Sequence, residues 1–153
     1  MKPNFNHNYR GIKCRVCLVR DGAYDEVIKI SEPSDAYELV KDELVNSDRE
    51  MFLSIMLTVK NALIGVETVC VGSVVAITVT PRDVFKSAIL ANAVAIIVCH
   101  NHPSGELTPS INDLEVTKEL VNAGELLGIK VLDHLIVSSQ GYKCLREYNE
   151  LPK

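Results

Sequence analysis

The chain has 153 residues, a hydrophobic fraction of 47% and a formal net charge of −4 at pH 7. This length suits one domain that can bury a core without disulfide or metal staples. No apolar run is long enough to cross a membrane, and no block of Lys and Arg predicts a nucleic-acid-binding surface. The amino-terminal residues contain no apolar stretch of the kind found in signal peptides, so we expect a cytoplasmic globular protein.

Hydrophobic periodicity predicts a mixture of helices and strands along the chain. Strands are expected at residues 12–20, 23–30, 49–59, 63–71, 74–79, 94–99, 130–138 and 142–145. Helices are expected at residues 31–46, 82–92 and 111–127. Asp21-Gly22 predicts that the first two strands form a hairpin, and the nearly continuous apolar run 49–59 is typical of a central strand.

These elements do not alternate strictly, which favours a mixed α/β sandwich over a doubly wound parallel sheet. Residues 1–34 are expected to form a polar lead-in and a β-hairpin. Residues 35–153 are expected to form the domain itself, and the whole chain is expected to make a single compact unit. No internal repeat or low-complexity segment interrupts it.

The chain has five cysteines, an odd number at scattered spacing that does not suggest a disulfide framework: Cys14, Cys17, Cys70, Cys99 and Cys144. We interpret them as buried cytosolic thiols, because a free cysteine is usually a small buried apolar residue. A redox or second metal role for Cys14 and Cys17 is the alternative.

Residues 98–113 carry the strongest functional signal. His100 and His102 stand two apart at the end of an apolar strand, so their imidazoles should face the same side. The loop that follows contains Gly and Pro and can fold back, which would bring Asp113 from the first turn of the next helix to the same point. Two histidines, one carboxylate and an open position make a catalytic zinc site.

The same residues also allow a purely structural interpretation. A bare His-x-His pair is a weak motif, and most such pairs bind nothing. Ser110 and Asp113 have the spacing of a capping box, in which Asp113 would only hold the end of a helix. Thr108 before Pro109 offers another start for that helix.

The spacing His100-x-His102, seven residues, Ser110, two residues, Asp113 resembles the JAMM motif of the MPN/JAB metallopeptidases. More narrowly, HNHPSGELTPSINDLEVTKEL is similar to the RadC-like branch of that family, and the likeness covers about residues 35 to 147. The resemblance implies an α/β sandwich of the MPN/JAB, cytidine-deaminase-like type, with a central mixed sheet flanked by helices.

The resemblance further implies a zinc-dependent hydrolase of peptide or isopeptide bonds, with His100, His102 and Asp113 as the metal ligands. The metal would lower the pKa of a bound water towards about 7, so that hydroxide becomes available at neutral pH. We therefore expect Zn²⁺ as the cofactor and a protein or peptide as the substrate.

Three further residues have expected roles. Arg49-Glu50-x-Phe52 resembles the position of the general-base glutamate in JAMM enzymes, so Glu50 is the expected base and Glu67 the reserve. Ser110 matches the JAMM serine that donates a hydrogen bond to the developing oxyanion, and its structural alternative is a plain helix cap. His134 is expected to be a core histidine, with a contact to a metal ligand as the alternative.

Two other functions stay open: a non-catalytic metal-binding scaffold, and a DNA-associated accessory factor, because the RadC family carries a DNA-repair name. Every JAMM residue is present, which counts against the scaffold. Longer RadC proteins carry a helix-hairpin-helix segment ahead of this domain, whereas residues 1–34 predict a β-hairpin, which argues against direct DNA binding. The sequence indicates no membrane contact and no particular oligomeric state.

Overall fold

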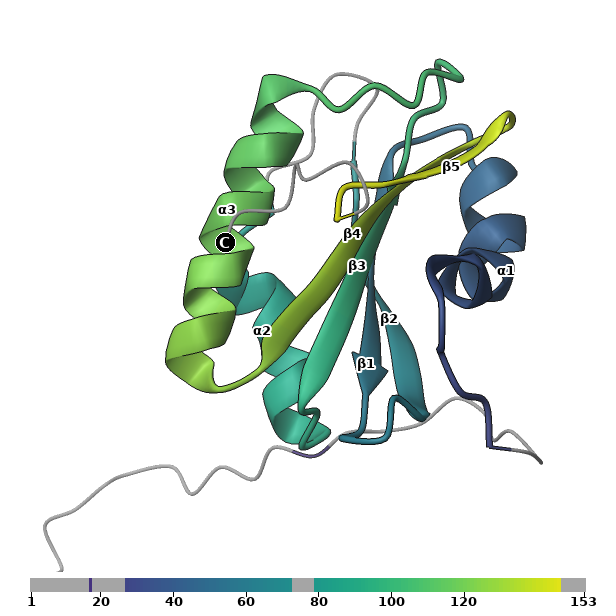
Figure 1. The fold of residues 1–153 in the computed structure, drawn as a ribbon. Helices are drawn as coiled ribbons and strands as arrows, with labels where there is room; N and C mark the ends of the chain where they lie inside the picture. Colours follow the sequence, from purple (N-terminus) through teal and green to yellow (C-terminus); the bar gives the residue numbers. More distant parts are fainter. Residues whose placement is uncertain (1–16, 18–26, 73–78, 147–153) are drawn as a thin grey trace, which may run out of the picture.

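The computed structural model describes residue 17, residues 27–72 and residues 79–146 (Figure 1). Within these ranges the helices are α1 (Pro33–Val45), α2 (Pro81–Leu90) and α3 (Ile111–Leu127). The strands are β1 (Met51–Leu57), β2 (Leu63–Val71), β3 (Ala95–Asn101), β4 (Lys130–Ser138) and β5 (Gly141–Cys144). They form one sheet in the order β2-β1-β3-β4-β5, in which β3 and β4 are parallel and every other neighbouring pair is antiparallel.

The inner strands are the most apolar segments of the chain. β3 is buried at every position, and β1 is buried at every position after Met51. A strand that is covered on both faces has no need of polar alternation, which explains these continuous apolar runs. The prediction that residues 49–59 hold a central strand is confirmed, because β1 pairs with both β2 and β3.

The sheet is covered on both faces, by α1 on one side and by α2 and α3 on the other (Figure 1). Alternate residues of β1 face the two sides, as the pleat requires. Leu53 and Ile55 belong to the core under α1, whereas Phe52 and Met56 belong to the core under α2 and α3. The predicted mixed α/β sandwich with a central mixed sheet is confirmed.

The element boundaries follow the predictions closely where the chain is described. The ranges predicted for β2, β4 and α3 agree with the structure, and Gly128 ends α3 in the left-handed conformation, with φ of +70°. β3 runs two residues further than predicted, to Asn101, so His100 lies inside the strand. The alternative helix start at Thr108 is wrong, because Ser110 caps α3.

Some predictions fall on residues outside the described ranges. These are most of the hairpin predicted at residues 12–30 and nearly all of the strand predicted at residues 74–79. The last residues before α1 do contact the domain: Ile30 is buried, and its N–H donates to the carbonyl of Asn61. The proposed boundary between residues 34 and 35 stays a prediction.

The cysteines only partly match the expectation of buried thiols. Four lie in the described part of the chain. Cys99 and Cys144 are buried, whereas Cys70 is half-buried and Cys17 is exposed. The prediction is wrong for these two, and for Cys70 the reason is that β2 is an edge strand. Among the described helices, none has both the length and the apolar character needed to cross a membrane.

Candidate metal centre

The end of β3 sets the position of the two candidate histidine ligands. His100 is buried on the face covered by α2 and α3, where the ring of Phe52 stacks on it at a centroid distance of 6.1 Å. The chain stays extended past the strand, because the N–H of His102 donates to the carbonyl of Val137 at 2.9 Å. The two imidazoles therefore lie on the same side, with their Nε2 atoms 2.9 Å apart.

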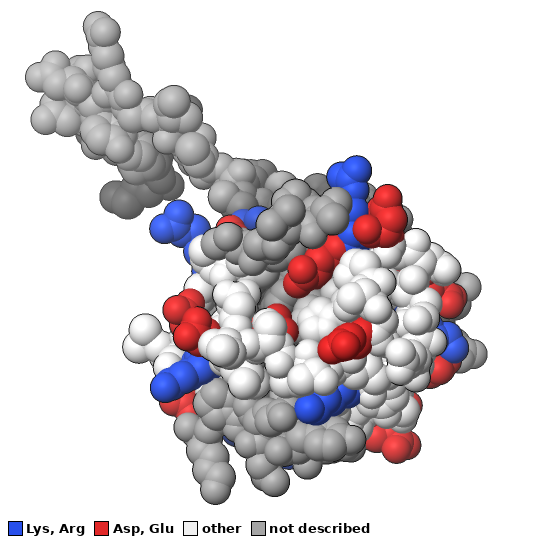
Figure 2. All heavy atoms as spheres, turned by 90° about the horizontal axis from the view of Figure 1, so that it is seen from above, with Lys and Arg blue, Asp and Glu red and all other residues white. Residues whose placement is uncertain are grey.

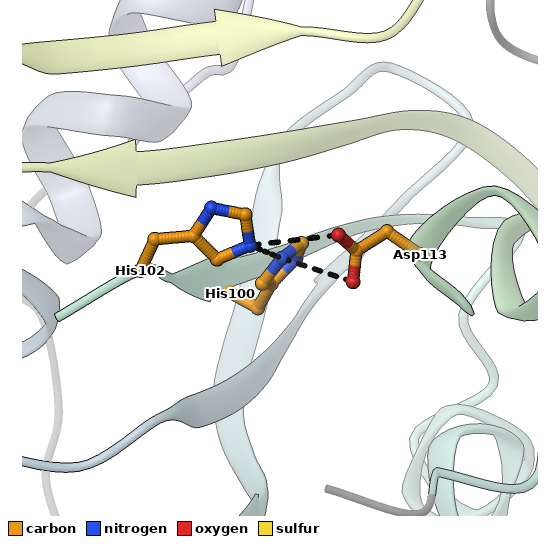
Figure 3. A group of neighbouring side chains, drawn as sticks. All are labelled: His100, His102 and Asp113. Atoms are coloured by element: carbon orange, nitrogen blue, oxygen red, sulfur yellow. Dashed lines mark hydrogen bonds and ion pairs between the residues drawn. The ribbon is translucent and has the colours of Figure 1, made fainter. Parts of the chain in front are cut away.

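The first turn of α3 brings a carboxylate to the same point. Ser110 and Asp113 form a capping box: the Ser110 hydroxyl accepts from the Asp113 N–H, and Asp113 Oδ2 accepts from the Ser110 N–H at 2.6 Å. The same carboxylate also faces both imidazoles, with Oδ1 3.4 Å from Nε2 of His100 and Oδ2 3.5 Å from Nε2 of His102 (Figure 3). The capping interpretation is confirmed, and it does not exclude the ligand interpretation, because the same carboxylate faces both imidazoles.

His100, His102 and Asp113 could hold a metal ion, because one ligand atom from each lies within 4.8 Å of the others. Nδ1 of His102 lies 2.8 Å from the carbonyl oxygen of Glu106. A carbonyl can only accept, so Nδ1 carries the hydrogen and Nε2 of a neutral His102 keeps its lone pair. Two ring nitrogens and a carboxylate that face one another need a cation between them, either a metal ion or a proton.

The pKa values of His102 and Asp113 are both shifted by contacts within the site. The contact with the Asp113 carboxylate is the main reason that the pKa of His102 is raised, and it outweighs partial burial, which lowers it. Burial would raise the pKa of the Asp113 carboxyl, but a proton on the facing nitrogen of His100 or His102 holds that pKa far below its usual range. Asp113 is therefore a carboxylate at any physiological pH, and its charge favours the protonated form of His102 in the metal-free protein.

His134 on β4 lies directly behind His100. Its Nε2 is 2.7 Å from Nδ1 of His100, and its Nδ1 is 2.5 Å from the hydroxyl of Thr117 on α3. Burial is the main cause that lowers the pKa of His134 well below its usual value, and the neighbouring His100 adds to it. The expectation of a satisfied core histidine is confirmed, and His134 also contacts the candidate ligand His100. Thr117 was not predicted, although it stands four residues after Asp113 on the same helix face.

Glu50 lines one hollow with two of the three metal candidates, His100 and Asp113. The other residues that line it are Phe52, Val79, Asn112, Val116 and His134. The backbone on both sides of Glu50 is fixed by Asn101, the residue between the two histidines. Its side chain accepts from the Met51 N–H at 2.6 Å and donates to the Arg49 carbonyl at 2.9 Å. This role of Asn101 was not predicted, because it depends on the antiparallel pairing of β1 with β3.

Glu67, the reserve base, lies elsewhere. Its carboxylate accepts a short hydrogen bond from the Ser87 hydroxyl and lies 4.0 Å from Nζ of Lys86. It is not among the residues that line the hollow with His100 and Asp113. The geometry therefore favours Glu50 over Glu67 as a group that could act beside the metal candidates.

Figure 2 looks down on the end of the molecule where β3 finishes and α3 begins. Uncharged side chains make up most of the described surface on this face. Acidic groups lie near its middle, and basic groups lie mainly towards its edge. An acidic centre suits a cation, whereas a phosphate backbone would require clustered Lys and Arg.

Comparison with known proteins agrees with this geometry. A family model described as a RadC-like JAB domain matches residues 30–150. A UPF0758 protein of Caldanaerobacter subterraneus subsp. tengcongensis is 49% identical over 122 residues, which are 80% of this chain and 52% of that protein. A UPF0758 protein of Staphylococcus haemolyticus is 45% identical over 124 residues, 81% of this chain and 54% of that protein. A UPF0758 protein of Methanosarcina mazei is 42% identical over 119 residues, 78% and 52% of the two chains.

The chain thus spans about half the length of the curated relatives that it matches. The five-stranded mixed sheet with helices on both faces is consistent with a JAB/MPN-type fold. The matched region includes β3, the loop after it and the start of α3, and hence all three candidate ligands. Because the family model covers most of the sequence, the chain belongs to the RadC-like JAB domain family.

Proposed function

We propose that this domain is a zinc-dependent metallohydrolase of the JAMM type, which cleaves a peptide or isopeptide bond. The observation that carries the proposal is the convergence of His100, His102 and Asp113 at one point beside a hollow that Glu50 also lines. Two imidazoles and one carboxylate, with room left for water, are the donor set of a catalytic zinc site. Magnesium and calcium prefer sites made of oxygen ligands alone, so zinc fits this set better.

A bound zinc would act as a Lewis acid and bring the pKa of a water towards about 7. The rest of the chemistry falls to the chain. Glu50 takes a proton from water and returns it to the leaving nitrogen, which requires a carboxylate held within reach of the site. The two hydrogen bonds of Asn101 to the backbone on either side of Glu50 hold this residue in place.

Ser110 is the proposed donor to the developing oxyanion. Its hydroxyl now donates to Oδ2 of Asp113 at 2.7 Å and accepts from the Asp113 N–H at 3.1 Å. To serve an oxyanion, the hydroxyl hydrogen must turn away from Asp113 while the helix cap persists through the backbone N–H of Ser110. A donor that is fixed in place by a helix end needs little reorganisation when charge develops.

Elemental analysis tests the metal, and one zinc per chain is the expected result. The His100→Ala, His102→Ala double variant should lose the zinc while it keeps its fold, because the core around it is apolar. Stoichiometric zinc in the folded double variant would overturn the site.

A peptide library and lysine-linked isopeptides, followed by mass spectrometry, test the hydrolysis. Glu50→Gln should keep its zinc and lose roughly two to four orders of magnitude in rate, which is the usual cost of removing a general base. Glu67→Gln is the matched control and should retain both the zinc and the rate. Zinc without any cleavage by the wild type would favour a metal-binding scaffold, and a fully active Glu50→Gln would move the base elsewhere.

A further inference from the structure

A buried line of hydrogen bonds joins two of the candidate ligands behind the metal position. It runs from Nδ1 of His100 to Nε2 of His134 at 2.7 Å, and from Nδ1 of His134 to the hydroxyl of Thr117 at 2.5 Å. The hydroxyl of Thr117 then reaches the backbone carbonyl of Asp113, also at 2.5 Å. Its members come from β3, β4 and α3, and His134 and Thr117 are fully buried.

The direction of each hydrogen bond follows from counting hydrogens, beginning at the carbonyl. A carbonyl oxygen can only accept, so the single hydroxyl hydrogen of Thr117 is donated to Asp113. The Thr117 oxygen must then accept from His134, which places a hydrogen on Nδ1 of that ring. A fully buried neutral imidazole has one N–H only, so Nε2 of His134 is an acceptor. Nδ1 of His100 must therefore be the donor to it.

The reverse direction leaves a clash. If Thr117 donated to His134, the Thr117 hydroxyl and the Asp113 carbonyl would be two oxygens 2.5 Å apart without a hydrogen between them. Unpaired acceptors in a buried site are costly, and Thr117 is not exposed to solvent that could relieve the cost. Only one direction satisfies all three contacts.

We propose that His134 and Thr117 are positioning residues that lock His100 in the tautomer protonated on Nδ1. The Nε2 lone pair of His100 is thereby held towards His102 and Asp113, where the metal would bind. The importance of this lock for catalysis rests on the proposed function. The tautomer itself does not, because it exists in the metal-free protein.

The lock also explains the short contact between the two candidate ligands. Nε2 of His100 lies 2.9 Å from Nε2 of His102, so one of these nitrogens must carry a hydrogen when no metal is bound. With His100 locked, that hydrogen belongs to His102. His102 itself is oriented by a different hydrogen bond, from its Nδ1 to the carbonyl oxygen of Glu106 in the loop that follows it. Loss of the His134 lock should therefore leave the contact of His102 Nδ1 with the Glu106 carbonyl in place.

Paired variants separate the lock from simple packing. In His134→Gln, the side-chain amide reaches about as far as Nε2 does, so its oxygen can still accept from His100. In His134→Asn, the shorter amide reaches about as far as Nδ1 does, so it can meet Thr117 but leaves His100 without an acceptor. Thr117→Ser keeps the hydroxyl, and Thr117→Val removes it at nearly constant volume.

Three measurements on the whole chain complete the test: zinc affinity by competition with a chromophoric chelator, thermal midpoint of the metal-free protein, and imidazole nitrogen-15 NMR. We expect zinc affinity to fall roughly 10- to 100-fold in His134→Asn, as is usual when the partner of a ligating histidine is lost. His134→Gln and Thr117→Ser should stay within a few-fold of wild type, whatever their thermal midpoints. Equal zinc affinities in His134→Asn and His134→Gln would overturn the proposal.

The NMR spectrum of the wild type gives an answer even if the variants fail to fold. In the metal-free protein His100 should show a hydrogen on Nδ1 and a bare nitrogen at Nε2. A hydrogen on Nε2 of His100 would overturn the lock outright. A wild type that binds no zinc, but shows Nδ1–H at His100, would sink the proposed function and leave the lock standing.

Discussion

At the residue scale, His102 should link the proposed metal binding to pH. Contact with Asp113 raises the pKa of His102 above its usual 6.5, so this pair stabilises the metal-free fold most strongly below pH 6.5. That contribution is lost as the pH rises through the raised pKa, because the proton leaves the folded state. Zinc needs the same nitrogen without its proton, so zinc affinity should increase over the same interval.

We therefore predict opposite slopes above pH 6.5: the thermal midpoint of the metal-free protein falls while zinc affinity rises. Asp113 does not interfere, since its lowered pKa keeps it charged throughout this interval. His102→Gln is the control, because it removes the titrating group and should flatten the pH dependence of the midpoint. A wild-type midpoint that does not change across the interval would contradict the pairing of His102 with Asp113.

The sequence could predict the ligand cluster because its geometry is local. Two residues of one strand share a face, and Asp113 stands at a fixed position of a capped helix start. The contact of His134 with His100 is different in kind. It depends on the parallel register that pairs Val98 with His134, a register set by packing between distant segments. Asn101 was missed for the same reason.

At the scale of elements, the loop between β3 and α3 positions His102 towards the proposed metal site. Gly105 has φ of +89°, a conformation that other residues resist. The turn at Gly105 brings the carbonyl of Glu106 to Nδ1 of His102. An added Cβ would meet only ordinary contacts, the nearest at 3.7 Å from Gln140, so strain in the backbone is the main effect of a substitution.

We predict that Gly105→Ala weakens zinc binding more than it lowers the thermal midpoint of the metal-free protein. Gly128→Ala is a matched control, because Gly128 has φ of +70°, no atom within 4 Å of an added Cβ, and a place at the far end of α3. Each substitution should cost about 1–2 kcal/mol of backbone strain. Gly128→Ala should lower the midpoint and leave zinc affinity unchanged. If Gly105→Ala behaves in the same way, the loop is only a structural brace.

The positions of the helices and strands could be predicted because their apolar residues recur at the regular spacing of a helix or a strand. Lys130–Ser138 and Ile111–Leu127 were delimited by turn and cap signals that act within a few residues. The end of β3 was harder to predict, since His100 and Asn101 are polar. His100 stays in the strand because it pairs with both β1 and β4, and Asn101 stays in it because it pairs with Val137 of β4. The end of a strand is therefore hard to predict from its apolar pattern when its last residues are polar.

At the scale of the whole molecule, the two faces of one sheet pack into two separate hydrophobic cores. Alternate residues of β1 and β3 face α1 on one side and α2 with α3 on the other, so neither core can be lost without disturbing the other. The metal candidates stand at the end of β3 and the start of α3. A ligand that binds only the folded arrangement there should stabilise the entire domain, not a local segment.

We therefore predict that zinc raises the midpoint of a single thermal transition. Free zinc at about 100 times its dissociation constant adds about 2.7 kcal/mol to a protein that binds it only when folded. For a domain of this size, each kcal/mol shifts the midpoint by roughly 2–4 °C, so the expected rise is roughly 5–10 °C. Magnesium should give a much smaller shift, because imidazole is a poor ligand for it. An equal zinc shift in the His100→Ala, His102→Ala double variant would place the stabilising ion elsewhere, and a transition that splits in two would refute the single cooperative unit.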